Sequence, residues 1–181
     1  MTDSRKSPTS RRACLAACGA WLFAAAVFAA PPANGVPSES LAITGAVKDK
    51  LTLKVADLQA LPTQLTLQTT ARVDGKEVAS SVRGVPLTAL LDRAALADAG
   101  HNDWKHTVVV ATGTDGYGVA FSWSELFNTE VGPSVLVIHE RDGKPLEEHE
   151  GRIALVSGKD LRAGPRNVHW LTKIDVRILG S

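Results

Sequence analysis

The chain has 181 residues, a length that suits one domain, and 44% of these residues are hydrophobic while 22% are charged. This is the composition of a globular protein and excludes a largely disordered chain. The formal net charge is only +1, so the sequence lacks the strongly basic surface that binding to nucleic-acid phosphates requires. We therefore expect no nucleic-acid partner.

The first thirty residues have the pattern of an export signal. A basic segment, SRKSPTSRR, precedes the apolar run ACLAACGAWLFAAAVFAA, and the small residues that end at Ala29 suit a signal peptidase. We predict a signal peptide over residues 1–29, a flexible linker rich in proline, glycine and serine over 30–40, and one domain over 41–181. The mature protein is expected to be periplasmic or secreted, without a stable membrane span.

The N-terminal segment leaves the export route open. The stretch SRRACL over residues 10–15 resembles the twin-arginine consensus but lacks its aromatic residue and lysine, so an ordinary signal fits as well. A lipobox ending at Cys18 is a further alternative, although the apolar region before it is short. An uncleaved anchor over 13–30 is another, which reaches the lower length limit of a membrane span but is rich in alanine. Both cysteines, Cys14 and Cys18, lie here. A processed chain would therefore have no disulfide and no thiolate metal ligand.

The rest of the chain is dominated by patterns typical of β-strands. Alternating or continuous apolar runs between turn residues predict strands over 41–47, 51–53, 63–73, 77–82, 107–112, 119–121, 134–140, 152–156 and 172–179. The turn residues Asp74-Gly75 predict a hairpin between the third and fourth of these strands. Leucines and alanines at helical spacing between Pro86 and Gly100 predict one main helix, and short helical turns are expected over 55–61 and 122–127. Ser122 and Glu125, at the start of the second turn, have the spacing of a capping box. The sequence predicts an α+β fold of mixed sheets with one main helix.

Several common kinds of chemistry have no support in the sequence. The five histidines do not form a metal-binding pair at helical spacing, and we expect them at the surface or in loops. No serine has a GxSxG context, and Gly158-Lys159 lacks the other residues of a phosphate loop. Glu147, Glu148 and Glu150 are expected to form a solvated acidic loop.

One loop, over residues 158–170, gathers most of the candidate binding residues. It contains Lys159, Arg162, Arg166 and His169 between two predicted strands. Cationic side chains and free backbone N–H groups together suit an anionic ligand, although charges in a loop are often only solvated.

The same loop resembles a known family. The stretch RNVHWLTKIDV is similar to the one that precedes the closing strand in the molybdopterin domain of sulfite oxidase and its bacterial relatives. Further similar pieces follow in the same order from Leu41 to Leu179, namely LAITGAV, ADLQALP, GVPLTALLDRA, TDGYGVAF and DGKPL. The resemblance implies that fold, a pterin cofactor held by the loop, and molybdenum bound by the cofactor and one protein cysteine.

Carried over by residue, the resemblance gives Arg166 the role of a phosphate ligand and places His169 where the family has lysine. Tyr117 matches an aromatic position that some members have near the metal. In place of the metal-binding cysteine the sequence has Thr69 or Thr70, whose hydroxyl groups are poor molybdenum ligands. Molybdopterin is therefore a possible cofactor and molybdenum a doubtful one.

Two functions follow from these residues. The first is an exported molybdopterin-dependent oxidoreductase-like protein that binds the pterin through Lys159, Arg162, Arg166, His169 and Tyr117. The alternative is a non-catalytic periplasmic ligand-binding or sensor module that kept the fold and lost the molybdenum ligand. In either case the expected partner is a small-molecule cofactor or ligand, and a membrane or redox partner is left open.

Overall fold

The computed structural model describes residues 35–180 except 74, 75, 98, 99, 101 and 163. The predicted signal peptide, with both cysteines, lies outside the described residues. Within the described part, no helix is long and apolar enough to cross a membrane.

The first sheet joins strands from both ends of the domain. Strand β10 lies between β1, with which it pairs in parallel, and β5, with which it pairs antiparallel. The remaining pairs, β1 with β2 and β5 with β6, are antiparallel. In spatial order the strands are β2 (Leu51–Leu53), β1 (Leu41–Gly45), β10 (Leu171–Ile178), β5 (Thr107–Gly113) and β6 (Gly118–Ser122).

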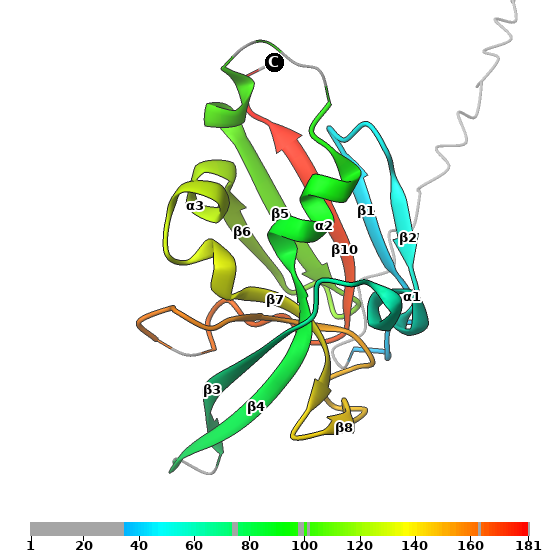
Figure 1. Cartoon of the computed structure of the whole chain (residues 1–181), viewed down its shortest axis with the longest axis vertical. Coiled ribbons are helices and arrows are strands. Elements are labelled where there is room, and N and C mark those ends of the chain that lie inside the picture. Colours follow the sequence, from blue (N-terminus) through cyan, green and yellow to red (C-terminus); the bar gives the residue numbers. More distant parts are fainter. Residues whose placement is uncertain (1–34, 74–75, 98–99, 101, 163, 181) are drawn as a thin grey trace, which may run out of the picture. The chain divides into compact units, whose positions relative to one another are not determined.

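The second sheet is built on the long hairpin of β3 and β4, which extends away from the first sheet in Figure 1. All its strand pairs are antiparallel, and β7 pairs with β4, β8 and β9. The strands are β3 (Leu65–Val73), β4 (Lys76–Pro86), β7 (Val135–Arg141), β8 (Lys144–Pro145) and β9 (Ala154–Ser157). The prediction of mixed sheets is confirmed, because one pairing is parallel and the others are antiparallel.

Helix α2 (Leu87–Ala94) is the main helix that the sequence predicts, and it lies in front of the first sheet in Figure 1. Its buried residues, Leu87, Leu90, Leu91 and Ala94, have helical spacing and join the larger apolar core. The helix is shorter than predicted, since Ala95 adopts φ 49° and its carbonyl accepts a hydrogen bond from the Lys48 N–H. The other helical segments are α1 (Val55–Ala60), α3 (Trp123–Asn128), η1 (Asp103–His106) and η2 (Gly132–Ser134).

The second half of the predicted linker is held on the domain. Val36 exchanges two hydrogen bonds with the Thr114 hydroxyl, at 2.9 and 2.7 Å, and Glu39 pairs with Arg152 at 2.9 Å. Ser38 is buried, and a side chain at Gly35 would collide with the Trp170 ring. Residues 35–40 therefore belong to the folded unit rather than to a flexible linker.

Candidate functional site

The loop over residues 158–170 is closed at its base by the strands that it connects. Leu155 of β9 and Val168 exchange backbone hydrogen bonds of 2.8 and 2.9 Å, and the Asn167 side chain accepts one from the Ser157 N–H. Trp170 then enters β10 with φ 48°, a conformation that a bulky residue seldom adopts. Its N–H donates to the Glu150 carbonyl and its indole N–H to the Glu148 carbonyl, so these contacts hold it in that conformation.

Arg166, the predicted phosphate ligand, is surrounded by carboxylates of the chain itself. Its guanidinium binds Asp160 through two nitrogens and the Glu125 carboxylate at 2.8 Å, and it lies 4.5 Å from the centre of the Phe121 ring. The hydrogen bond from Arg166 lowers the pKa of Asp160, and the same contact raises the pKa of Arg166. An anionic ligand would therefore have to compete with two carboxylates for this guanidinium.

Two more of the predicted residues are also engaged. The Tyr117 hydroxyl donates a hydrogen bond of 2.6 Å to the Pro165 carbonyl, which places this tyrosine against the loop beside Arg166. The Lys159 ammonium lies 2.6 Å from Glu130, and both side chains are exposed. This contact lowers the pKa of Glu130. Arg162 is exposed and has no charged partner among the described residues.

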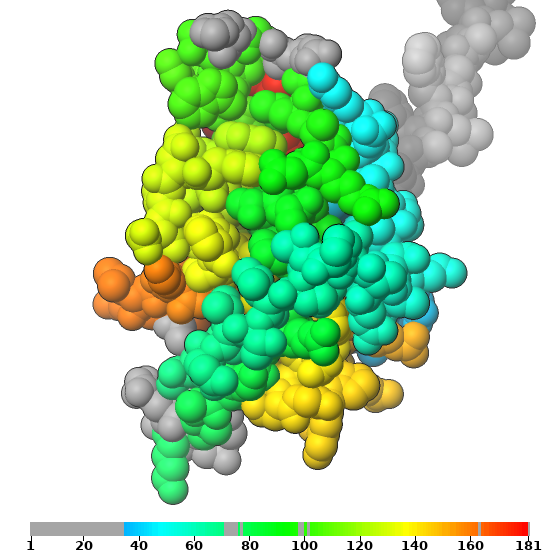
Figure 2. Space-filling model, in the orientation of Figure 1, coloured from blue at the N-terminus to red at the C-terminus, as the bar shows by residue number. Residues whose placement is uncertain are grey.

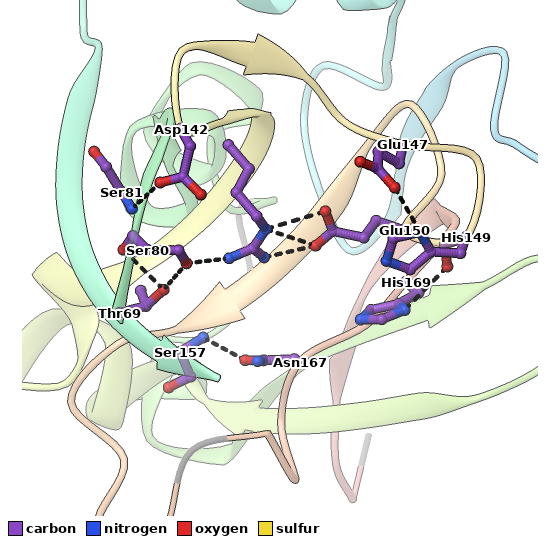
Figure 3. Close-up of polar contacts among 11 residues, drawn as sticks. Thr69, Ser80, Ser81, Asp142, Glu147, His149, Glu150, Ser157, Asn167 and His169 are labelled. Carbon is purple, nitrogen blue, oxygen red and sulfur yellow. Dashed lines mark hydrogen bonds and ion pairs between the residues drawn. The ribbon is translucent and has the colours of Figure 1, made fainter. Parts of the chain in front are cut away.

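His169 lies apart from the Arg166 cluster, beside His149. The two imidazole rings are 6.5 Å apart at their centres, and His169 Nδ1 is 3.2 Å from the His149 carbonyl oxygen. Figure 3 shows this pair on one side of Glu150, with Thr69 and Ser80 on the other. The structure thus brings Tyr117 and Arg166 together, with Lys159 at the start of the same loop, and leaves His169 on a different stretch of the surface.

Thr69 is the member of the threonine pair that faces the packed side of the sheet. Its hydroxyl lies 3.3 Å from the Ser80 hydroxyl, whereas Thr70 is exposed. Ser80 in turn accepts a 2.6 Å hydrogen bond from Arg141, whose guanidinium also binds the Glu150 carboxylate at 2.6–3.0 Å. We call these four residues, Thr69, Ser80, Arg141 and Glu150, the Thr69 network.

Three sequence expectations are wrong in this region. Glu150 is not solvated with Glu147 and Glu148 but is only 6% exposed, because it pairs with Arg141. His139, expected at the surface, is buried in β7, where its Nε2 lies 3.1 Å from the Gln64 side-chain oxygen. The Ser122 cap of α3 is confirmed, but the Glu125 carboxylate binds Arg166 instead of completing a capping box.

A family model describes almost the whole domain. The model of the oxidoreductase molybdopterin-binding domain matches residues 30–178. The chain belongs to this family. The match confirms the resemblance to the sulfite oxidase family, and the residues that carried it, between Leu41 and Leu179, lie almost entirely within the matched range. No curated protein sequence matches the chain.

A solved structure supports the same fold. The crystal structure of the sulfane dehydrogenase SoxCD from Paracoccus pantotrophus is similar, with a TM-score of 0.60 and 20% sequence identity. The likeness covers 78% of this chain and 39% of that one. At this identity it shows a shared fold, which confirms the predicted α+β architecture.

Among the described residues, the stretch in which the resemblance places the metal-binding cysteine offers no thiolate for a molybdenum centre. Thr69 and Thr70 occupy the stretch in which the resemblance places the cysteine, and the half-buried Thr69 hydroxyl already contacts Ser80. A threonine hydroxyl is a hard and weakly acidic group, unlike the thiolate that soft metal sites use. Among the described residues, no group of three His, Asp or Glu side chains is placed to hold a metal.

Proposed function

We propose that the protein is an exported, non-catalytic binding module of the molybdopterin-binding domain family. In this proposal the fold and the loop over 158–170 serve to bind a small polar ligand, and no metal is bound through the protein. The observation that carries the proposal is the Thr69 network. In this network the Thr69 hydroxyl contacts the Ser80 hydroxyl, and the resemblance places the metal-binding cysteine of enzymatic members in the stretch that contains Thr69.

The electrostatics of the loop support the same proposal. Arg166 is compensated by Asp160 and Glu125, and Lys159 by Glu130. An enzyme that binds the phosphate of a pterin would be expected to keep these cations available for hydrogen bonds to the phosphate oxygens. Within the described part of the loop, the side chains of Arg162 and His169 are exposed and stay open to an incoming ligand.

The molybdopterin-dependent oxidoreductase is the second candidate function. It is favoured by the family match and by the contact of Tyr117 with the loop next to Arg166, two positions that the resemblance assigns to the cofactor site. The two candidates differ in what the exported protein carries. The enzyme needs molybdenum and pterin together, whereas the binding module needs no metal.

Cofactor content tests the proposal directly. The mature protein is purified after export from cells that make molybdopterin, molybdenum is measured by elemental analysis, and pterin is measured by fluorescence after oxidation. We expect molybdenum at background, with or without pterin. Molybdenum near one equivalent per chain, together with pterin, would overturn the proposal in favour of the enzyme.

Two variants make the result specific to the site. If pterin is present, Arg166→Ala is expected to release it, while Arg177→Ala, on exposed β10 surface, serves as the matched control. The Thr69→Cys variant restores a thiol on the packed side of β3. If Thr69→Cys gains molybdenum while the wild-type protein has none, the missing thiol is the reason for the loss, as the proposal requires.

A further inference from the structure

Strand β3 is an unusually open edge of the second sheet. Within the described part of the chain it pairs only with β4, and no other segment forms backbone hydrogen bonds with residues 65–70. In an antiparallel pair, every second residue directs its N–H and C=O groups away from the partner strand. One side of β3 therefore presents a row of unpaired backbone groups, and Figure 2 shows this strand in teal at the molecular surface.

The sequence of β3 lacks the features that protect an edge strand. Natural edges are usually blocked by charged side chains, by proline or by a β-bulge. Residues 63–71, TQLTLQTTA, contain no charge and no proline, and the nine β3–β4 pairs run without a register shift. By contrast, the pairing of β4 with β7 shifts register at Arg83 and Gly84. The open edge is therefore regular enough to accept another strand.

Exposed apolar surface continues from the start of this edge. Leu65 is 40% exposed and lines an open hollow of about 320 Å³ between β3, α2 and α3. Phe127, which is 36% exposed, lines it as well. In Figure 2 the lime, green and teal of α3, α2 and β3 meet on this face. A strand added to β3 would run past Leu65 and reduce the exposure of this surface.

We propose that β3 is the interface of a homodimer, in which two copies pair their β3 strands antiparallel about a two-fold axis at Gln68. This register pairs Leu65 with Ala71 of the copy and uses only uncharged residues, because the stretch 65–71 is centred on Gln68. A shift toward the hairpin tip would bring the charged Arg72 into the paired stretch. Such an isologous contact is self-complementary and closes at two chains.

The interface extends the hydrogen-bonded ladder from one chain into the next. The contact is a strand edge rather than a broad face, so it belongs with the small, reversible class of interfaces. We expect a monomer–dimer equilibrium that depends on protein concentration. This inference is independent of the proposed function, because cofactor content and oligomeric state are measured separately and either can fail alone.

Sedimentation equilibrium of the mature protein, from micromolar to near-millimolar concentration, tests the interface. Gln68→Glu places two like charges opposite each other at the axis and should weaken the dimer by up to about fivefold. Gln68→Lys should do the same, and an equimolar mixture of the two variants should form a dimer at least as strong as the wild-type one. Thr52→Glu, at an exposed position of edge strand β2, is the control and should leave the equilibrium unchanged.

The outcomes separate the proposal from its rivals. A protein that stays monomeric over the whole range, or a dimer that both Gln68 variants leave unchanged, overturns it. A dimer that Thr52→Glu weakens as much as Gln68→Glu also overturns it, because the interface then lies on the other sheet. Circular dichroism and the denaturation midpoint of each variant confirm that it is folded, so loss of the dimer is not loss of the fold.

Discussion

The Arg141–Glu150 pair gives the sharpest test of how this face of the domain is stabilised. Glu150 is 6% exposed, and its carboxylate receives three hydrogen bonds from the Arg141 guanidinium. Replacing Arg141 with methionine keeps most of the side-chain volume but leaves a buried carboxylate without a cation. Breaking a buried ion pair in this way costs about 3–5 kcal/mol of folding free energy.

The lower end of that range applies here. The Arg141 side chain is 23% exposed, so water can enter where the guanidinium was and solvate the carboxylate in part. We therefore expect Arg141→Met to lower the free energy of unfolding by about 3 kcal/mol, which is a fall in Tm of roughly 6–12 °C for a domain of this size. Urea denaturation at pH 7, with an unchanged m-value, measures the loss.

The double variant Arg141→Met with Glu150→Leu is the control. It removes both charges, so no buried carboxylate is left uncompensated, and its stability should return to within about 1 kcal/mol of the wild-type value. A loss below about 1 kcal/mol in the single variant would refute the reasoning, since the pair would then be effectively solvated. A double variant as unstable as the single one would show that packing, rather than the unpaired charge, causes the loss.

Three further predictions concern stability, and each is measured by denaturant unfolding. Gly84→Ala should cost several kcal/mol because its Cβ would lie 2.1 Å from the Val137 carbonyl oxygen, whereas Gly118→Ala, with its nearest contacts at 3.6 Å, should be tolerated. Leu90→Ala, in the buried stripe of α2, should cost about 2–5 kcal/mol. Burial lowers the pKa of His139, so the unfolded chain binds its proton more readily and stability should fall as the pH drops below about 6.5. His139→Gln should flatten that slope, and an unchanged slope would exclude His139 as its source.

Local patterns predicted the elements of the fold well. The turn residues Asp74-Gly75 predicted the hairpin, and the register of β3 and β4, with Val73 opposite Lys76, confirms a two-residue connection. Strand β4, however, is longer than predicted and continues through Arg83 to Pro86. Gly84 and Pro86 are typical of a turn, but β7 lies alongside them and supplies the pairing. Pairing with a strand that is distant in sequence cannot be predicted from the local residue pattern, so the end of β4 was missed.

The site was harder to predict for the same reason. The sequence singles out cations in the loop over 158–170, but it does not show their partners: Asp160 lies in the same loop, whereas Glu125 and Glu130 come from segments about 30 to 40 residues earlier. Glu125, 41 residues before Arg166, has the spacing of a helix cap, and its role as a partner becomes visible only in three dimensions. Glu150 is similar. Its neighbours are acidic and polar, and only the return of the chain beside the end of β7 buries it against Arg141.

Arg141, Arg166 and Lys159 each have a carboxylate of the same chain within hydrogen-bonding distance. These three cations are therefore compensated by carboxylates of the chain itself without any ligand. A domain built in this way does not need an anionic cofactor to offset its cations, and a ligand that binds here must displace internal ion pairs or use the exposed residues at their rim. This favours a weak and exchangeable ligand over a permanently bound cofactor, which agrees with the role proposed from Thr69.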